Sequence, residues 1–213
     1  KTGRPSAVDW AEPDKVANSI KLMKIKHAVI TSVDRDDLKD MGSIIWAETV
    51  NAIRRINPNT TLETLIPDFQ GNKRNIDRII DVAPEVVSHN VETVSRLTRK
   101  VRVQAKYDTS LDVLLYLKNN GINRTKSGIM LGLGEEENEV YESLSDLRNV
   151  KVDIVTIGQY LRPTQRHRLI DRYVSEEEFE QYKTIGQELG IPHIESGPLV
   201  RSSYHAKDSF ASV

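Results

Sequence analysis

The chain has 213 residues, with 30 Lys and Arg against 31 Asp and Glu, a net charge of -1, and no cysteine. This length suits one large domain and is short for two. The near-neutral charge argues against a protein whose main partner is nucleic acid, because such proteins normally carry a basic surplus. Without cysteine the chain forms no disulfide and offers no thiolate to a metal.

Targeting signals do not stand out in the sequence. No apolar run approaches the roughly 18 residues needed to cross a membrane, and the polar start Lys1–Pro5 has no apolar core behind it. We therefore expect a cytoplasmic protein. Since no low-complexity linker divides the chain, we expect one domain over residues 1–213, with residues 196–213 as an irregular tail.

Helical and strand patterns alternate along the chain. In chain order they predict a helix over 13–24, a strand over 27–33, a helix over 37–55, a strand over 62–66, a helix over 73–81, a strand from 86, helices over 94–100 and 111–119, a strand over 125–131, a helix over 136–148, a strand over 154–160, a helix over 176–190 after a capping box at 175–178, and a short strand over 192–195. This rhythm is typical of parallel α/β folds.

The number of strands limits the architecture. A complete eight-stranded barrel usually needs about 250 residues. We therefore expect an incomplete barrel or an open α/β sheet, with a first strand ahead of residue 1.

Polar residues follow each predicted strand, at the edge where such folds build their sites. After the first strand, Thr31–Asp37 carries hydroxyls and carboxylates that could grip an amino group or a ribose; the alternative is a helix cap with an acidic first turn. After the third, alternation places Asn90 and Glu92 on one face, which suits ribose hydroxyls. The alternative there is a polar strand end with a hydrogen-bonded His89.

Two further features have both a functional and a structural interpretation. Gly132–Glu135 could let backbone approach a ligand or simply form a tight strand-to-helix turn. Two basic stretches could receive an acidic partner or be solvated surface. They contain Arg96, Arg99, Lys100, Arg102 and Lys106, and Arg162, Arg166, Arg168 and Arg172.

The carboxyl-terminal tail is unusually rich in polar and aromatic residues after its glycine-proline turn. A fraying terminus would be expected there. We instead expect a tail docked across the barrel mouth.

Six motifs occur in order and together carry a family resemblance. They are Thr31–Leu38, Glu63–Phe69, His89–Glu92, Thr125–Glu135, Gly158–Pro163 and Arg201–Ala206. Over essentially its whole length the chain closely resembles the lipoyl synthases, a family of radical S-adenosylmethionine enzymes.

The resemblance implies a partial (β/α)6 TIM-like barrel of the radical S-adenosylmethionine type. It implies insertion of sulfur at carbons 6 and 8 of an octanoyl group on a lipoyl carrier protein or domain. It also implies two [4Fe-4S] clusters, one radical-generating and one auxiliary, together with S-adenosylmethionine. The expected partners are the octanoylated carrier and an electron donor such as flavodoxin or ferredoxin, and we expect a monomer.

The resemblance also assigns roles to individual residues, carried over by motif. Thr31, Ser32, Asp34 and Asp36 would hold the methionine part of the cofactor, and Asn90 and Glu92 would face its ribose. Lys126 and Gly132 would lie near the same cofactor. Ser203, with Ser202 as the alternative, would bind an iron of the auxiliary cluster. The surroundings of the substrate or cluster would include Arg201, Tyr107 and Arg162.

One departure from the family pattern is large. Family members carry two cysteine triplets, one for each cluster, and this chain has no cysteine. We expect those triplets ahead of residue 1, so the chain would be the barrel body and inactive alone. Two alternatives stay open: a cluster-independent barrel lyase or hydrolase that uses Lys126 as a Schiff-base or general-base group, and a non-catalytic module that binds S-adenosylmethionine or the carrier.

Overall fold

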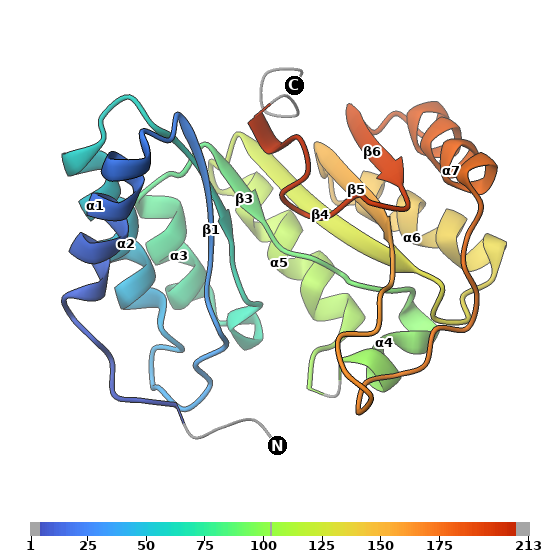
Figure 1. Ribbon diagram of the computed structural model, residues 1–213, viewed down its shortest axis with the longest axis horizontal. Coiled ribbons are helices and arrows are strands. Elements are labelled where there is room, and N and C mark those ends of the chain that lie inside the picture. Colours follow the sequence, from blue (N-terminus) through green and yellow to red (C-terminus); the bar gives the residue numbers. More distant parts are fainter. Residues whose placement is uncertain (1–4, 103, 208–213) are drawn as a thin grey trace.

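The computed structural model describes residues 5–102 and 104–207. Within them, six parallel strands form one sheet in the order of the sequence, from β1 to β6 (Figure 1). The strands are β1 His27–Thr31, β2 Thr61–Leu65, β3 Val86–Ser88, β4 Arg124–Leu131, β5 Ile154–Gln159 and β6 His193–Gly197. β1 and β6 each pair on one side only, so the barrel is open between them, and Figure 1 shows the curvature of the sheet.

Helices cover the convex side of the sheet and alternate with the strands (Figure 1). They are α1 Glu12–Met23, α2 Ser43–Ile56, α3 Lys73–Asp81, α4 Ser95–Val101, α5 Tyr107–Asn119, α6 Glu137–Asn149 and α7 Glu176–Glu188, with a short 3-10 turn η1 at Phe69–Gly71. This arrangement confirms the expected partial barrel of alternating strands and helices. None of the helices in the described part of the chain is long and apolar enough to cross a bilayer.

Local sequence explains where several helices begin. The predicted capping box opens α7, where the Ser175 hydroxyl accepts from Glu178 N and the Glu178 side chain returns to the Ser175 backbone. The helix predicted from residue 37 begins only at Ser43, because residues 37–42 form turns and Met41 and Gly42 have positive φ. A left-handed residue interrupts the helical backbone, so the acidic segment before it remains a loop.

The core lies between the sheet and its helices. Strand residues that point outward pack under the helices in three buried clusters, the largest of which joins β4 and β5 to α6 and α7. The inward-pointing residues of the same strands line the concave face. Because side chains alternate along each strand, one set of residues packs against the helices and the other set lines the concave face.

The concave face has a closed region near the middle of the strands, which we call the barrel floor. Glu63 of β2 and Lys126 of β4 meet there; Lys126 Nζ donates to Glu63 Oε2 at 3.0 Å, and neither side chain is more than 1% exposed. Burial raises the pKa of Glu63, although the Lys126 charge opposes this shift.

The tail after β6 also lies on the concave face, and its last described residue is Lys207. The carbonyl of Val200 lies against Gly158, where an added Cβ would stand 2.2 Å from the oxygen. Beyond that contact the tail runs toward the amino-terminal edge of the sheet (Figure 1). The pKa of His27, at the start of β1, is lowered first by burial and further by the charges of Lys126 and Lys207. The described tail thus lies away from the mouth, and the expectation of a lid across the mouth is wrong.

Candidate functional site

Two adjoining cavities open at the carboxyl ends of the strands, and together we call them the mouth. One has a volume of about 630 Å³ and the other about 640 Å³. Both are lined by Asp34, Pro67 and Arg102, so they share a wall. Each volume is in the usual range for small-molecule sites, and their place in the fold is where parallel barrels carry their chemistry.

The loop after β1 supplies the first wall. Thr31, Ser32 and Asp34 line the 630 Å³ cavity, and Asp36 lines the other. Ser32 is fixed by Trp46, whose Nε1 donates to its hydroxyl at 3.1 Å. Burial raises the pKa of Asp34, and the neighbouring carboxylates of Asp36 and Asp68 add to this shift. A bound cation would relieve that repulsion.

The segment after β3 supplies the second wall. Asn90 and Glu92 line the same cavity as Thr31, and Asn90 Nδ2 donates to Glu92 Oε1 at 3.1 Å. Glu92 has a φ of 68°, and its backbone still pairs with β4 through Glu92 N to Gly128 O at 2.9 Å. Gly128 leaves room for the Asn90 amide, since a Cβ there would lie 3.0 Å from Asn90 Oδ1. Burial raises the pKa of Glu92.

A buried histidine fixes an arginine at the mouth. His89 Nδ1 lies 2.9 Å from Ile66 O and Nε2 lies 2.9 Å from Ser110 Oγ. Burial lowers the pKa of His89 to about 4, so the ring is neutral at pH 7. With Nδ1 donating to the carbonyl, Nε2 accepts from the Ser110 hydroxyl. That oxygen in turn accepts from Arg102 Nη1 at 3.2 Å, and the same Nη1 donates to Asn90 O at 3.0 Å.

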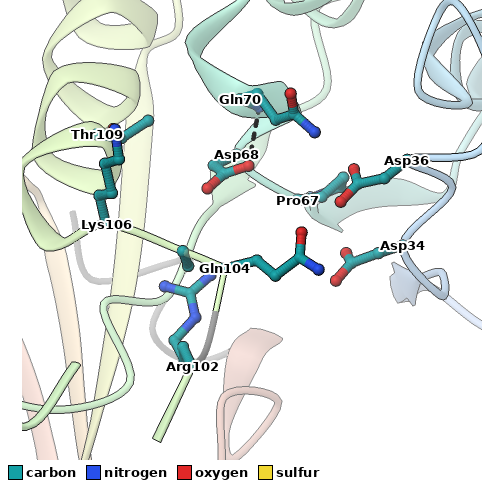
Figure 2. A pocket seen from close by; sticks show the side chains of 10 residues that line it. Asp34, Asp36, Pro67, Asp68, Gln70, Arg102, Gln104, Lys106 and Thr109 are labelled. Atoms are coloured by element: carbon teal, nitrogen blue, oxygen red, sulfur yellow. Dashed lines mark hydrogen bonds between the residues drawn. The ribbon is translucent and has the colours of Figure 1, made fainter. Parts of the chain in front are cut away.

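The mouth is electrostatically divided. Figure 2 shows Asp34 and Asp36 on one wall of the 640 Å³ cavity and Arg102 with Lys106 on the opposite side. Asp68 is partly used as a cap, because its Oδ1 accepts from Gln70 N at 2.9 Å. The cavity can therefore hold a ligand with both positive and negative groups, oriented by the two walls.

Two of the predicted cofactor residues do not line either cavity. Lys126 is buried in the barrel floor with its amine on Glu63. Gly132 forms the alternative tight turn: its N donates to Glu135 Oε1 at 2.6 Å, and a Cβ would lie 2.3 Å from Gln159 Nε2. The close approach at this glycine is to protein rather than to a ligand. The buried ion pair equally opposes a Schiff-base role for Lys126.

The predicted surroundings of the substrate are also dispersed. Tyr107 is in the core, where its hydroxyl donates to Asp146 Oδ2 at 3.1 Å, and burial raises its pKa. Arg162 bonds within its own loop, through Nε to His167 O at 2.9 Å, and its loop neighbours line the cavity. Arg201 Nη1 donates to Val200 O at 2.6 Å. Ser203 is exposed on the tail, outside both cavities.

Sequence reasoning missed the pairing that positions Arg102. In the sequence Arg102 is one member of a basic stretch, and Ser110 stands just ahead of the helix predicted over 111–119. Only the contact of Ser110 with His89, and of Arg102 with Ser110, gives them a place at the mouth. No local pattern signals this, because the three residues come from a strand end, an irregular segment and a helix.

The residues present fit S-adenosylmethionine and do not fit an iron-sulfur cluster. Asn90 Oδ1 is buried without a hydrogen-bond partner among the described residues, and it lies beside the carboxylate of Glu92. Such acceptors suit hydroxyl donors of a ribose. Cluster iron normally takes thiolate ligands, and the chain has none. Over residues 5–102 and 104–207, no group of three His, Asp or Glu is placed to hold a metal ion.

Comparison with known proteins places these observations in a family. The Radical SAM superfamily model matches residues 1–147. The mitochondrial lipoyl synthase of Nematostella vectensis is 75% identical over 207 residues, covering 97% of this chain and 71% of that protein. The lipoyl synthase of Christiangramia forsetii is 72% identical with the same coverage of 97% and 71%.

Solved structures support the fold. HydG, a maturase of the [FeFe]-hydrogenase, superposes with a TM-score of 0.67 at 13% identity, over 98% of this chain and 56% of that one. Streptococcus suis SuiB bound to S-adenosylmethionine gives 0.69 at 10% identity, over 92% and 45%. Sequence and fold agree, and the chain belongs to the lipoyl synthase family of the radical S-adenosylmethionine superfamily.

Proposed function

We propose that the full-length protein built around this chain is a sulfurtransferase that makes the lipoyl cofactor. It would replace one hydrogen at carbon 6 and one at carbon 8 of a protein-bound octanoyl group by sulfur. High identity to lipoyl synthases along 97% of the chain supports this. The single structural observation that carries it is the mouth, where Asn90 and Glu92 stand with Thr31 and Asp34 around one cavity.

The chain's own residues would bind and orient the cofactor. Asn90 and Glu92 would accept from ribose hydroxyls, while the carboxylates of Asp34 and Asp36 would attract the cationic methionine part. S-adenosylmethionine, when bound and reductively cleaved, supplies the radical that removes hydrogen from the octanoyl chain. Arg102, fixed through Ser110, would hold the wall beside Asn90 in place.

Membership of the superfamily implies an iron-sulfur cluster as well as S-adenosylmethionine. We propose two [4Fe-4S] clusters whose thiolate ligands come from cysteines outside these 213 residues, with Ser203 as an oxygen ligand of the auxiliary cluster. An oxygen ligand binds iron less well than a thiolate does, which suits a cluster that gives up its sulfur. The chain alone would then be inactive.

The proposed partners are an octanoylated lipoyl carrier protein or domain and an electron donor such as flavodoxin or ferredoxin, with the protein itself a monomer. The Nematostella relative is named as mitochondrial. A mitochondrial location therefore stands beside the cytoplasmic one predicted from the sequence.

The test is a single-turnover assay with the reconstituted full-length protein. Iron and sulfide analysis should find two clusters, and mass spectrometry of the carrier should find two sulfur atoms added to the octanoyl group. Ser203→Ala should bind S-adenosylmethionine nearly as the parent does and make little lipoyl product. Absence of sulfur insertion by the parent protein would refute the function, and full product from the variant would refute the role of Ser203.

A further inference from the structure

The connection between β5 and α7, residues 160–175, is long, irregular and well anchored. Loops longer than about 12–15 residues in compact domains are usually functional or disordered. Here Tyr160 OH donates to Arg168 O at 2.9 Å, and Asp171 N donates to Gly132 O at 2.9 Å. At its end, Val174 N donates to Gln159 Oε1 at 2.9 Å. The loop is thus held in one shape at the edge of the mouth.

Three exposed cations at this edge have no counter-charge. Lys100 at the end of α4, and Arg166 and Arg168 in the loop, line the 630 Å³ cavity. Within the described parts of the chain, no carboxylate lies within ion-pair distance of any of them. Their neighbours differ: Arg96 pairs with Glu139 at 2.6 Å and Arg172 with Glu178 at 2.8 Å. We call Lys100, Arg166 and Arg168 the basic rim.

Large apolar side chains are exposed in the same loop as Arg166 and Arg168. Leu161 is 48% exposed, Leu169 68% and Tyr173 72%, all in the same loop. Arginine and tyrosine beside exposed apolar groups are typical of protein interfaces. A merely solvated loop would not be expected to present three such residues in so short a segment.

The opposite side of the mouth carries negative charge. Asp34 and Asp36 stand on the β1 side, across from the basic rim. An acidic surface that approaches the mouth is attracted to one side and repelled by the other, which fixes its orientation. The rim therefore fits an acidic partner in one pose.

We infer that the basic rim docks an acidic face of the protein that carries the octanoyl-lysine; this rests on the proposed function. The acyl chain must enter the cavity that the rim borders, so the carrier has to stand over these residues while the chain is inside. The position of the rim favours the carrier.

The experiment measures binding of the octanoylated carrier domain to the full-length protein. The variant Arg166→Glu with Arg168→Glu should raise the dissociation constant at low salt by about tenfold or more. Among the described residues neither side chain makes a hydrogen bond, so the change breaks no internal side-chain hydrogen bond. Added salt should weaken binding of the parent protein more than that of the variant.

A matched control reverses the same amount of charge elsewhere. Lys21→Glu with Arg148→Glu changes exposed residues in the last turns of α1 and α6, at the opposite edge of the sheet. Carrier affinity should then change less than about twofold. Circular dichroism and melting temperature check the folding of both variants, and Arg166→Gln with Arg168→Gln provides a milder second test.

The outcomes separate this inference from the proposed function. Equal carrier affinity of the rim variant and the parent, or equal losses in rim and control variants, would overturn the docking surface. So would a rim variant that binds the carrier normally but loses a flavodoxin-type donor. If the parent protein binds the carrier through the rim but inserts no sulfur, the proposed function fails while the docking surface stands.

Discussion

The barrel floor and the mouth both place polar side chains on the concave face, but among the described residues only those of the floor form a buried ion pair with one another. In the floor, Lys126 and Glu63 neutralise each other at 3.0 Å. In the mouth, among the described residues, Asn90 Oδ1 has no hydrogen-bond partner and the carboxylates of Asp34 and Glu92 line a cavity without a buried cation beside them. Burial raises the pKa of these two carboxyls as it does that of Glu63.

The difference shows which polar residues are structural and which await a ligand. A buried polar group left unpaired costs roughly 1–3 kcal/mol, so a fold keeps it only where something else compensates. In the floor, the ion pair of Lys126 and Glu63 supplies that compensation from within the chain. The mouth is therefore the region where substitutions should alter binding more than stability.

The largest effect is expected from Lys126→Met, which leaves the Glu63 carboxylate buried without its counter-charge. The free energy of unfolding should fall by about 3–5 kcal/mol, measured by urea denaturation of the cluster-free full-length protein. Adding Glu63→Gln should restore much of this loss. If Lys126 instead binds the cofactor, as its motif predicts, Lys126→Met would lower the affinity for S-adenosylmethionine and leave the free energy of unfolding unchanged. Lys126 would then belong with the binding residues of the mouth rather than with the floor.

The second effect concerns His89 and pH. Its pKa falls from 6.5 to about 4 on folding, so between these values the folded protein binds fewer protons than the unfolded chain. The stability is complete above pH 6.5 and is lost as the pH falls, by roughly 3 kcal/mol in full and roughly 2 kcal/mol at pH 5. His89→Gln should lack this component. An identical pH dependence in the variant would show that folding does not lower the pKa of His89.

The third effect is a loss of binding without a loss of stability. Asn90→Ala should raise the dissociation constant for S-adenosylmethionine by about tenfold or more. A hydrogen bond to a ligand contributes about 1–3 kcal/mol when its loss leaves a buried group unpaired. Equilibrium dialysis measures the affinity. Asn149→Ala, exposed at the end of α6, is the matched control and should change nothing. Equal affinity in both variants would remove Asn90 from the site.

The smallest effect is expected from Ser203→Ala. The side chain is exposed on the tail and makes no hydrogen bond within the described chain. The free energy of unfolding should therefore stay within about 0.5 kcal/mol of the parent value, measured by the same denaturation. A larger change would mean that Ser203 holds the tail to the barrel, as the floor residues hold each other.

The sequence predicted most elements and much of the mouth. The helix at residues 73–81 coincides with α3, and the first strand differs from β1 only in its end. Thr31, Ser32, Asp34, Asp36, Asn90 and Glu92 all line the mouth, and their contact with the cofactor stays a prediction. Strand ends and polar clusters are local patterns, so local reasoning finds them.

What the sequence alone determined is the alternation of strands and helices, the polar segments after each strand and the lack of thiolates. Only the tertiary structure decided that Lys126 belongs to the floor, that Gly132 serves a turn, and that Arg102 is fixed through Ser110. Lys126 meets a carboxylate 63 positions away in the chain. Contacts over such separations depend on how strands stack side by side, and no local pattern of residues records which side chains will then meet.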